Sequence, residues 1–268
     1  GAWTLGGGRQ LRLRLEREVG QLNFDDFVAS SSAVSTGAVL AGNPDLSPQP
    51  AWVSELAFDQ RLTWGAVLVA TYRHAELSDV IDRAPILVGG RAVADAPGNI
   101  GAGRRDEFIL NLTLPLERFG LTGAQWRGQV TVRDSEVRDP ATGAAREISA
   151  LRPVEWELHL THDLPAWRGN WGVDVLGGYR ERSYRLSEVE TRKQGVWGTV
   201  FGERKLAADL ILRLEVQNLT ERHVRRIREI HSGPRSVAPV AGAGGRGPGC
   251  GRAVFVGLRR ALSEQGGA

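Results

Sequence analysis

The sequence predicts an all-β fold, an antiparallel transmembrane β-barrel in which each strand has one apolar and one polar face. Three observations indicate it: long segments that alternate apolar and polar residues, connections that are alternately short and long, and aromatic residues near segment ends. Alternation with a period of two places the apolar side chains on one face of an extended strand. Strands of soluble proteins usually hold about 5–6 residues, whereas a tilted membrane-spanning strand needs about 9–11.

The first part of the chain contains several such segments. Residues 10–19 (QLRLRLEREV) alternate Leu with Arg and Glu, and residues 51–60 (AWVSELAFDQ) set Trp, Leu and Phe against Glu and Asp. Residues 64–73 (WGAVLVATYR) follow the same rule with Trp, Leu and Tyr on one face. Residues 106–116 (DEFILNLTLPL) and 124–135 (AQWRGQVTVRDS) are longer, and each sets Phe, Trp, Leu or Val against polar residues.

The second part repeats the pattern. Residues 153–163 (PVEWELHLTHD) and 170–182 (NWGVDVLGGYRER) carry Trp, Val and Leu on one face. Residues 196–203 (VWGTVFGE) are a shorter case, and residues 206–218 (LAADLILRLEVQN) are the clearest, with apolar residues at every even position from 206 to 216. Residues 252–262 (RAVFVGLRRAL) close the series, so about ten strands are expected.

The connections carry a second signal, because their lengths alternate. Outer-membrane barrels have short periplasmic turns and longer extracellular loops in this order. We therefore expect residues 117–123 and 164–169 in the periplasm, and residues 76–105 and 219–251 at the cell surface. The other short links are residues 60–62 and 204–205, and the other long ones are residues 24–50, 136–152 and 183–193.

The alternation also predicts which side chains face lipid. Amphipathic rings prefer the headgroup level, so the aromatic residues near strand ends are expected to form girdles on the apolar face. These residues are Trp52, Trp64, Tyr72, Trp126, Trp171 and Tyr179. We expect lipid contact for Trp156, Leu158, Leu160, Leu210, Leu212 and Leu214, and a lumen-facing position for Glu155, Glu157, Arg213 and Glu215.

Composition excludes several classes of function. The 34 basic and 31 acidic residues give a net charge of only +3, which does not favour a nucleic-acid partner. The lone Cys250 has no partner for a disulfide or a metal site. His74, Glu76 and Asp79 fit no metal-ligand spacing and are interpreted as the solvated end of a strand. The basic residues 221–236 are interpreted as a solvated loop. We expect no catalytic, cofactor-binding or metal-binding residues, and the sequence does not identify the ligand-binding ones.

One short motif points to a family. Residues 42–50 (GNPDLSPQP) run into the strand at 51–60 and resemble the GNPxLKPE element that precedes a late barrel strand in TonB-dependent outer-membrane receptors. The matching positions are Asn43, Pro44, Leu46 and Pro48. Residues 64–86, 212–226 and 255–262 resemble later strands of the same family, in the same order.

The resemblance implies the C-terminal part of a 22-stranded barrel, with the plug and the TonB-binding segment absent from this sequence. It implies a Gram-negative outer membrane and energised uptake of a scarce small molecule such as a ferric siderophore or cobalamin. The implied partners are outer-membrane lipid, the missing N-terminal strands and plug, and TonB acting through that plug. The alternative is a soluble or surface-attached β-sandwich that serves as a binding module; unlike a barrel, it would need no detergent.

Overall fold

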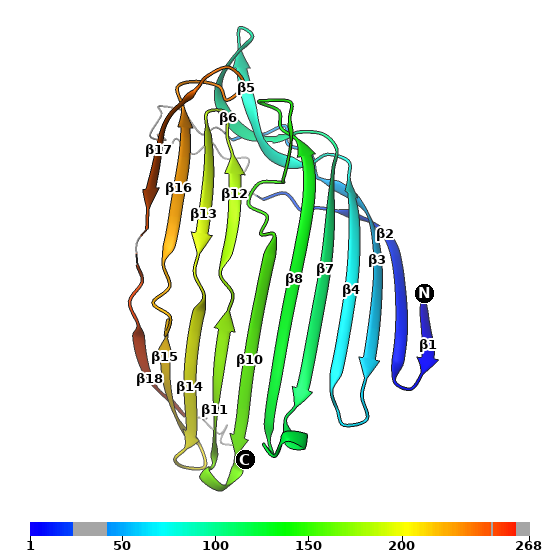
Figure 1. The fold of residues 1–268 in the computed structure, drawn as a ribbon, viewed down its shortest axis with the longest axis vertical. Coiled ribbons are helices and arrows are strands. Elements are labelled where there is room, and N and C mark those ends of the chain that lie inside the picture. Colours follow the sequence, from blue (N-terminus) through cyan, green and yellow to red (C-terminus); the bar gives the residue numbers. More distant parts are fainter. Residues whose placement is uncertain (24–41, 248, 261–268) are drawn as a thin grey trace, which may run out of the picture.

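A single curved wall of antiparallel strands dominates the structure, a computed structural model that describes residues 1–23, 42–247 and 249–260 (Figure 1). Neighbouring strands in the wall are paired in the order β1-β2-β3-β4-β7-β8-β10-β11-β14-β15-β18. The bounds are β1 (Ala2–Gly6), β2 (Arg9–Val19), β3 (Pro50–Arg61), β4 (Val67–Leu77), β7 (Gly103–Pro115), β8 (Ala124–Arg138), β10 (Val154–Leu164), β11 (Gly169–Leu176), β14 (Trp197–Lys205), β15 (Leu210–Gln217) and β18 (Ala253–Arg260).

Two smaller sheets lie at the loop end of this wall, and the short β9 (Ala145–Arg146) pairs with β8. A four-stranded sheet continues the wall above β11, β14, β15 and β18, and a separate hairpin caps the same end (Figure 1). The four-stranded sheet contains β12 (Tyr179–Tyr184), β13 (Glu188–Gln194), β16 (Val224–His231) and β17 (Val240–Arg246), and the hairpin contains β5 (Ile81–Val88) and β6 (Arg91–Asn99). The all-β prediction is therefore confirmed, and the β-sandwich alternative does not describe this single wall.

The break between the two parts of the wall has a local cause at Gly177. A Cβ at this position would lie 2.5 Å from Nε1 of Trp156, so the strand leaves its pairing where the indole of β10 fills the space. The N–H of Gly177 still donates to the carbonyl of Trp156 at 2.7 Å. A side chain at Gly177 would have to displace the indole, so glycine suits this close approach.

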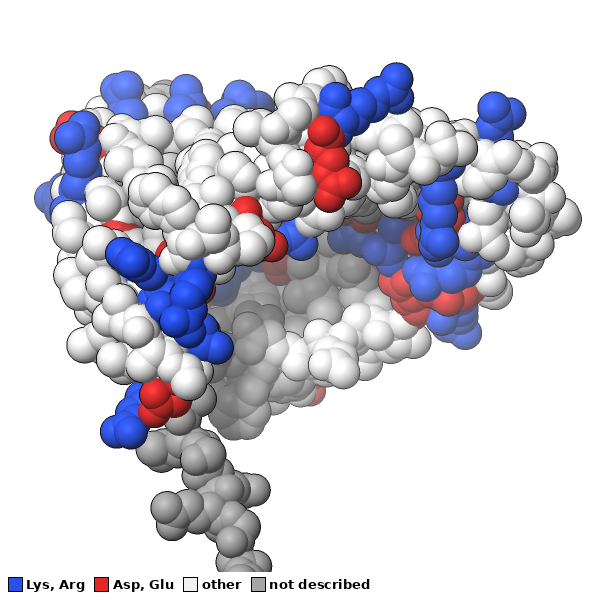
Figure 2. All heavy atoms as spheres, turned by 90° about the horizontal axis from the view of Figure 1, so that it is seen from below, with Lys and Arg blue, Asp and Glu red and all other residues white. Residues whose placement is uncertain are grey.

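Cross-strand register separates the two faces of the wall. One row of directly opposite residues crosses six strands on the outer face and is wholly apolar. It consists of Leu13, Leu56, Tyr72, Phe108, Val132 and Val154. The adjacent row points to the concave face and alternates in charge: Arg14, Glu55, Arg73, Glu107 and Arg133. Seen from below, red and blue side chains gather inside the hollow, while most of the outer surface in view is white (Figure 2).

The apolar surface lies mainly on the outside. Leu13, Phe108 and Leu214 are 47%, 48% and 51% exposed, although each is a large apolar side chain on a long strand. A continuous apolar surface of this kind on a soluble monomer would mark an interaction surface. The buried apolar cluster is small by comparison, and it sits on the concave face near the loop end. It contains Ala51, Val53, Ala75, Leu77, Val80 and Val137.

The short and the long connections lie at opposite ends of the wall, as the alternation of their lengths predicts. The short links, including the two 3₁₀ turns η2 (Glu117–Phe119) and η3 (Pro165–Trp167), lie at one end, and the long connections lie at the other (Figure 1). Among the described residues, no helix is long and apolar enough to cross a membrane. Strands β1 and β18 form the two edges of the wall and are not paired with each other within the described part, so these strands form an open wall.

Several strand predictions need correction. The segment expected at residues 64–73 begins only at Val67, because Gly65 (φ 89°) forms a turn whose N–H bonds to Leu62. The segment at residues 170–182 is two strands, β11 and β12, in different sheets. The segment at residues 206–218 begins at Leu210, because Leu206 and Ala207 form a turn that bonds to its carbonyl. Residues 261–262 of the last segment lie outside the described residues.

The long connections contain more structure than expected. Residues 76–105 include β5 and β6, residues 183–193 include most of β13, and residues 219–251 include β16 and β17. The basic residues 221–236 therefore include strand β16 and are not a simple loop. Strand β1 was also missed, since the left-handed glycines Gly6, Gly7 and Gly8 close a hairpin onto β2. Of the long connection expected at residues 24–50, residues 24–41 lie outside the described part.

Candidate functional site

A ladder of ion pairs runs across the concave face and defines the first part of the site. Arg73 Nη2 lies 2.6 Å from Glu18, and its Nη1 lies 3.6 Å from Glu107. On the next strand, Arg133 pairs with Glu107 at 2.7 Å and also with Glu155. Since opposite charges directly across neighbouring strands attract, the register stabilises the wall while its inner face stays polar.

The ladder continues past the break in the wall. Arg152 lies 2.7 Å from Glu155 and 3.2 Å from Glu181 on β12. Glu181 in turn pairs with Arg192 on β13 at 3.1 Å. These contacts bridge the main sheet and the four-stranded sheet, so the charged surface runs from β2 to the upper part of the wall.

A cavity of about 460 Å³ lies where the ladder crosses the break. Arg152 lies over the ring of Tyr179 at 3.8 Å, and Arg222 lies over the ring of Trp197 at 4.4 Å. Such stacked cations and rings present flat contact surface and hydrogen-bond donors to a small molecule. The lining also includes Gln129, Thr131, Arg133, Glu155, Glu157 and Gln194.

Charge in this cavity is largely compensated. Arg133 and Arg152 both bond Glu155, whereas Arg222 has no carboxylate partner among the described residues. With the Gln194 amide turned so that its oxygen faces the guanidinium, that oxygen accepts from Arg222 Nη2 at 2.9 Å. Arg222 is therefore the lining cation best placed to meet an anionic or oxygen-rich group.

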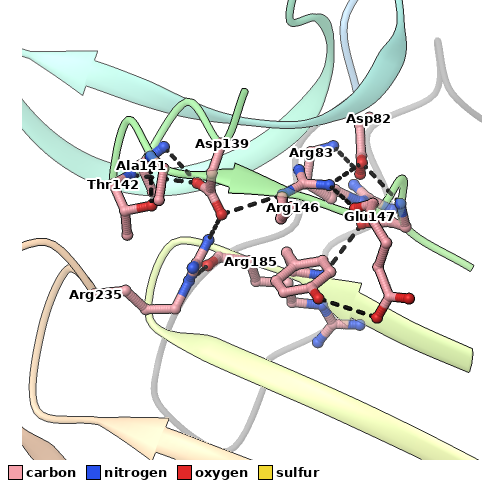
Figure 3. Close-up of polar contacts among 12 residues, drawn as sticks. Asp82, Arg83, Asp139, Ala141, Thr142, Arg146, Glu147, Arg185 and Arg235 are labelled. Atoms are coloured by element: carbon pink, nitrogen blue, oxygen red, sulfur yellow. Dashed lines mark hydrogen bonds and ion pairs between the residues drawn. The ribbon is translucent and has the colours of Figure 1, made fainter. Parts of the chain in front are cut away.

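A buried polar network locks the loop end above the cavity (Figure 3). Arg146 donates to Asp82 at 2.8 Å and to Asp139 at 3.1 Å, and Arg235 donates to Asp139 at 2.6 Å. The four side chains are at most 9% exposed. Asp82 starts the β5–β6 hairpin, Asp139 follows β8, and Arg235 lies between β16 and β17, so the network joins three connections that are distant in sequence.

Two buried carboxyl groups at the loop end have pKa values that are shifted in opposite directions. Burial alone would raise the pKa of Asp139, but the hydrogen bond from Arg235 and the backbone N–H of Ala141 outweigh it and hold that pKa below its usual value. Burial raises the pKa of Asp95, although both of its oxygens accept from the N–H of Leu186 at 2.8 Å. Arg235 thus provides for Asp139 the close charged partner that Asp95 lacks.

The family motif lies beside the loop-end hairpin. Asn43 donates to the carbonyl of Pro97 at 3.0 Å and accepts from the N–H of Asp45 at 3.0 Å. Leu46 is buried at 6% exposure, whereas Pro44 and Pro48 are exposed. The segment is thereby fastened to β6 before it enters β3. Whether Asn43, Pro44, Leu46 and Pro48 have a role shared with a family stays a prediction.

Other polar groups remain outside the cavity. His74 contacts Asp106 at 2.7 Å and Glu76 at 3.0 Å on the outer face. Of His74, Glu76 and Asp79, the structure therefore brings His74 and Glu76 together. No group of three or more acidic, His or Cys side chains that could hold a metal ion occurs in the described part of the chain. His159 and Asp174 contact each other at 2.7 Å on the concave face, beside Glu157.

The expected division of faces matches the register, except that Tyr179 and Trp156, both expected on the apolar face, border the cavity. Leu158 lies opposite Val175 and Leu214 opposite Val256, whereas Arg213 pairs with Glu203 at 2.8 Å on the other face. Tyr179 was expected on the apolar face but lines the concave cavity. The break at Gly177 and Gly178 ends the alternation of β11, so parity counted from Trp171 does not carry over into β12. Lipid contact itself stays a prediction.

These features define a class of fold: a curved antiparallel wall with an apolar outer face and a charged inner face, as in large β-barrels. Three solved structures of mutants of the ferric enterobactin receptor (PfeA) from Pseudomonas aeruginosa are similar to it, two of them in complex with enterobactin. Their TM-scores are 0.62, 0.62 and 0.63, at 17%, 18% and 18% identity. Each comparison covers 97% of this chain and 39% of the receptor chain. No family model matches the sequence, and no curated protein matches it.

Proposed function

We propose that this chain forms the C-terminal part of the barrel of a TonB-dependent outer-membrane receptor, which takes up a scarce small molecule. The observation that carries the proposal is the likeness of nearly the whole chain to part of a ferric enterobactin receptor. The chain spans less than two fifths of that receptor. The proposal therefore assigns the remaining strands, the plug and the contact with TonB to sequence outside this chain.

The two faces of the wall support placement in an outer membrane. An Arg that faces lipid at the bilayer midplane costs about 2–4 kcal/mol, so a spanning wall keeps its cations on the inner side. Arg73, Arg133 and Arg213 all lie on the concave face, where each has a carboxylate partner. The long connections then lie at the cell surface and the short ones in the periplasm.

The open edges indicate why more chain is needed. Unpaired backbone groups in hydrocarbon cost several kcal/mol each, so β1 and β18 need strand partners in a membrane. Other strands of the same receptor can supply them and close the barrel. A ligand such as a ferric siderophore or cobalamin would then pass along the charged concave face, past the cavity at Arg222.

Uptake by the assembled receptor tests the proposal. The chain is joined to the sequence encoded upstream of Gly1 and expressed in a strain without its own siderophore and cobalamin receptors. Uptake of radiolabelled ferric enterobactin and of cobalamin is measured with and without a protonophore. We expect protonophore-sensitive uptake of at least one ligand from the joined protein and none from the chain alone. Energised uptake by the chain alone, or none by a correctly inserted joined protein, would contradict the proposal.

A further inference from the structure

Three cations form an unpaired row on the outer face of the upper wall. Arg180 on β12 lies directly opposite Lys193 on β13, and Lys193 lies directly opposite Arg225 on β16. All three are exposed, and none has an ion pair or hydrogen bond with another described residue. Like charges directly opposite one another on neighbouring strands repel, so the row is unfavourable in the absence of an anion.

Alternation places this row on the outside. The neighbours Glu181, Arg192 and Arg226 belong to the ion-pair ladder of the concave face, where Arg192 pairs with Glu181 and Arg226 with Glu190. Successive side chains of a strand point to opposite faces. Arg180, Lys193 and Arg225 therefore point away from the ladder.

The row differs from two ion pairs on the outer face at this end. Arg104 is paired with Glu136 at 3.0 Å, and His74 with Asp106 at 2.7 Å. The carboxylates on the outer side near the row are Glu147 and Glu229, and Glu147 already contacts Arg182 at 3.5 Å. The row thus leaves three charges of one sign together, with no carboxylate partner among the described residues.

The position of the row fits the boundary of a membrane. A surface groove of about 460 Å³ includes Arg180, Lys193, Pro153 and Val154 in its lining. Val154 is the first residue of β10 at the loop end, and Trp156, Leu158 and Leu160 follow it on the same face, so the cations lie beyond the loop end of this apolar column. A lipid in contact with the apolar column would have its headgroup at the height of the groove.

We propose that Arg180, Lys193 and Arg225 bind the phosphate groups of an anionic lipid headgroup in the leaflet at the loop end. The inference rests on the proposed membrane placement, and goes beyond it by assigning a lipid site. Lys and Arg near an anionic membrane surface each contribute about 1 kcal/mol to binding. Removal of all three charges should weaken the site by roughly 100-fold.

The test measures binding of lipid A to the chain, joined to its upstream sequence as above, in detergent micelles by native mass spectrometry. Bisphosphorylated lipid A is compared with its dephosphorylated form, and the chain with the triple variant Arg180→Gln, Lys193→Gln and Arg225→Gln. The matched control is Arg118→Gln, Arg168→Gln and Lys205→Gln, which removes the same charge from exposed cations at the short-turn end. Inorganic phosphate at millimolar concentration is added as a competitor.

We expect the unmodified chain and the control to bind the bisphosphorylated lipid far more tightly than the dephosphorylated one, and the triple variant to lose this preference. Equal binding of both lipids by the unmodified chain would overturn the inference, even if the triple variant failed to fold. Displacement of the lipid by inorganic phosphate would also overturn it, because the site would then not select a lipid. Solubility without detergent is measured separately. A chain that stays soluble without detergent would overturn the proposed function as well.

Discussion

Substitution of Asp139 by Asn should loosen the loop end of the wall. The carboxylate is 2% exposed and accepts from Arg235 at 2.6 Å, Arg146 at 3.1 Å, and the N–H groups of Ala141 and Thr142 at 2.8 and 3.3 Å. Loss of one partner of a buried ion pair costs about 3–5 kcal/mol, because the remaining charge stays buried. An Asn oxygen can still accept from the N–H of Ala141, and Arg146 keeps its contact with Asp82. We therefore expect the substitution to lower the free energy of opening of the loop end by about 3 kcal/mol, the lower end of this range.

Hydrogen exchange in detergent micelles measures this loss. A change of about 3 kcal/mol corresponds to exchange that is roughly 100-fold faster at residues 139–149 and 234–238. The matched control is Glu136→Gln, which removes a carboxylate at the same end from a pair whose side chains are about half exposed. Exposed pairs contribute at most about 1 kcal/mol, so this control should exchange nearly as the unmodified chain does. Equal exchange in the two variants would refute the argument that the buried network holds the loops together.

Two further predictions concern the break and the response to acid. The variant Gly177→Ala would place a Cβ 2.5 Å from Trp156 and should destabilise the fold by about 1–3 kcal/mol, measured by urea unfolding. The control Gly242→Ala has open space around the added Cβ and should have a small effect. Equal losses of stability in the two variants would contradict the packing argument. The lowered pKa of Asp139 gives stability that is present above its unfolded pKa and lost as the pH falls through the folded value. The raised pKa of Asp95 has the opposite effect: the unmodified protein loses stability as the pH rises from the ordinary carboxyl pKa through the raised folded value. The variant Asp95→Asn should lack this loss, which proteolysis of the loop end measured against pH would detect. A pH dependence of proteolysis that is the same in the variant and the unmodified protein would contradict this prediction.

The long strands could be predicted because their local pattern and their tertiary role agree. Strand β8 alternates from Ala124 to Arg133, and both of its neighbours continue the same apolar row. The start of β15 was placed too early, because Leu206 continues the alternation although it forms a turn with Leu210. Alternation alone does not distinguish a strand from a turn whose residues keep the same period.

The loop-end strands and the site could not be predicted in the same way. Strands β5 and β6 contain Pro85, Pro97 and Gly98, which usually indicate a connection, yet the two strands pair with each other from Ile81 and Asn99 to Val88 and Arg91. The ion-pair ladder depends on register between strands, which a single sequence does not specify. Asp139 and Arg235 meet across 96 positions of the chain. The alternating charges on Arg73 and Glu107 were visible as polar faces, but their pairing required the fold.

The most direct test of the account is whether the outer face of the wall contacts lipid. Single cysteines are introduced in a Cys250→Ser background at Leu158 and Glu157, and at Leu212 and Arg213, in the joined receptor in its membrane. Each variant is labelled with a lipid-phase reagent and, separately, with a water-soluble one. The account predicts preferential lipid-phase labelling at positions 158 and 212 and water-phase labelling at positions 157 and 213. The reverse pattern, or water-phase labelling at all four positions, would contradict it.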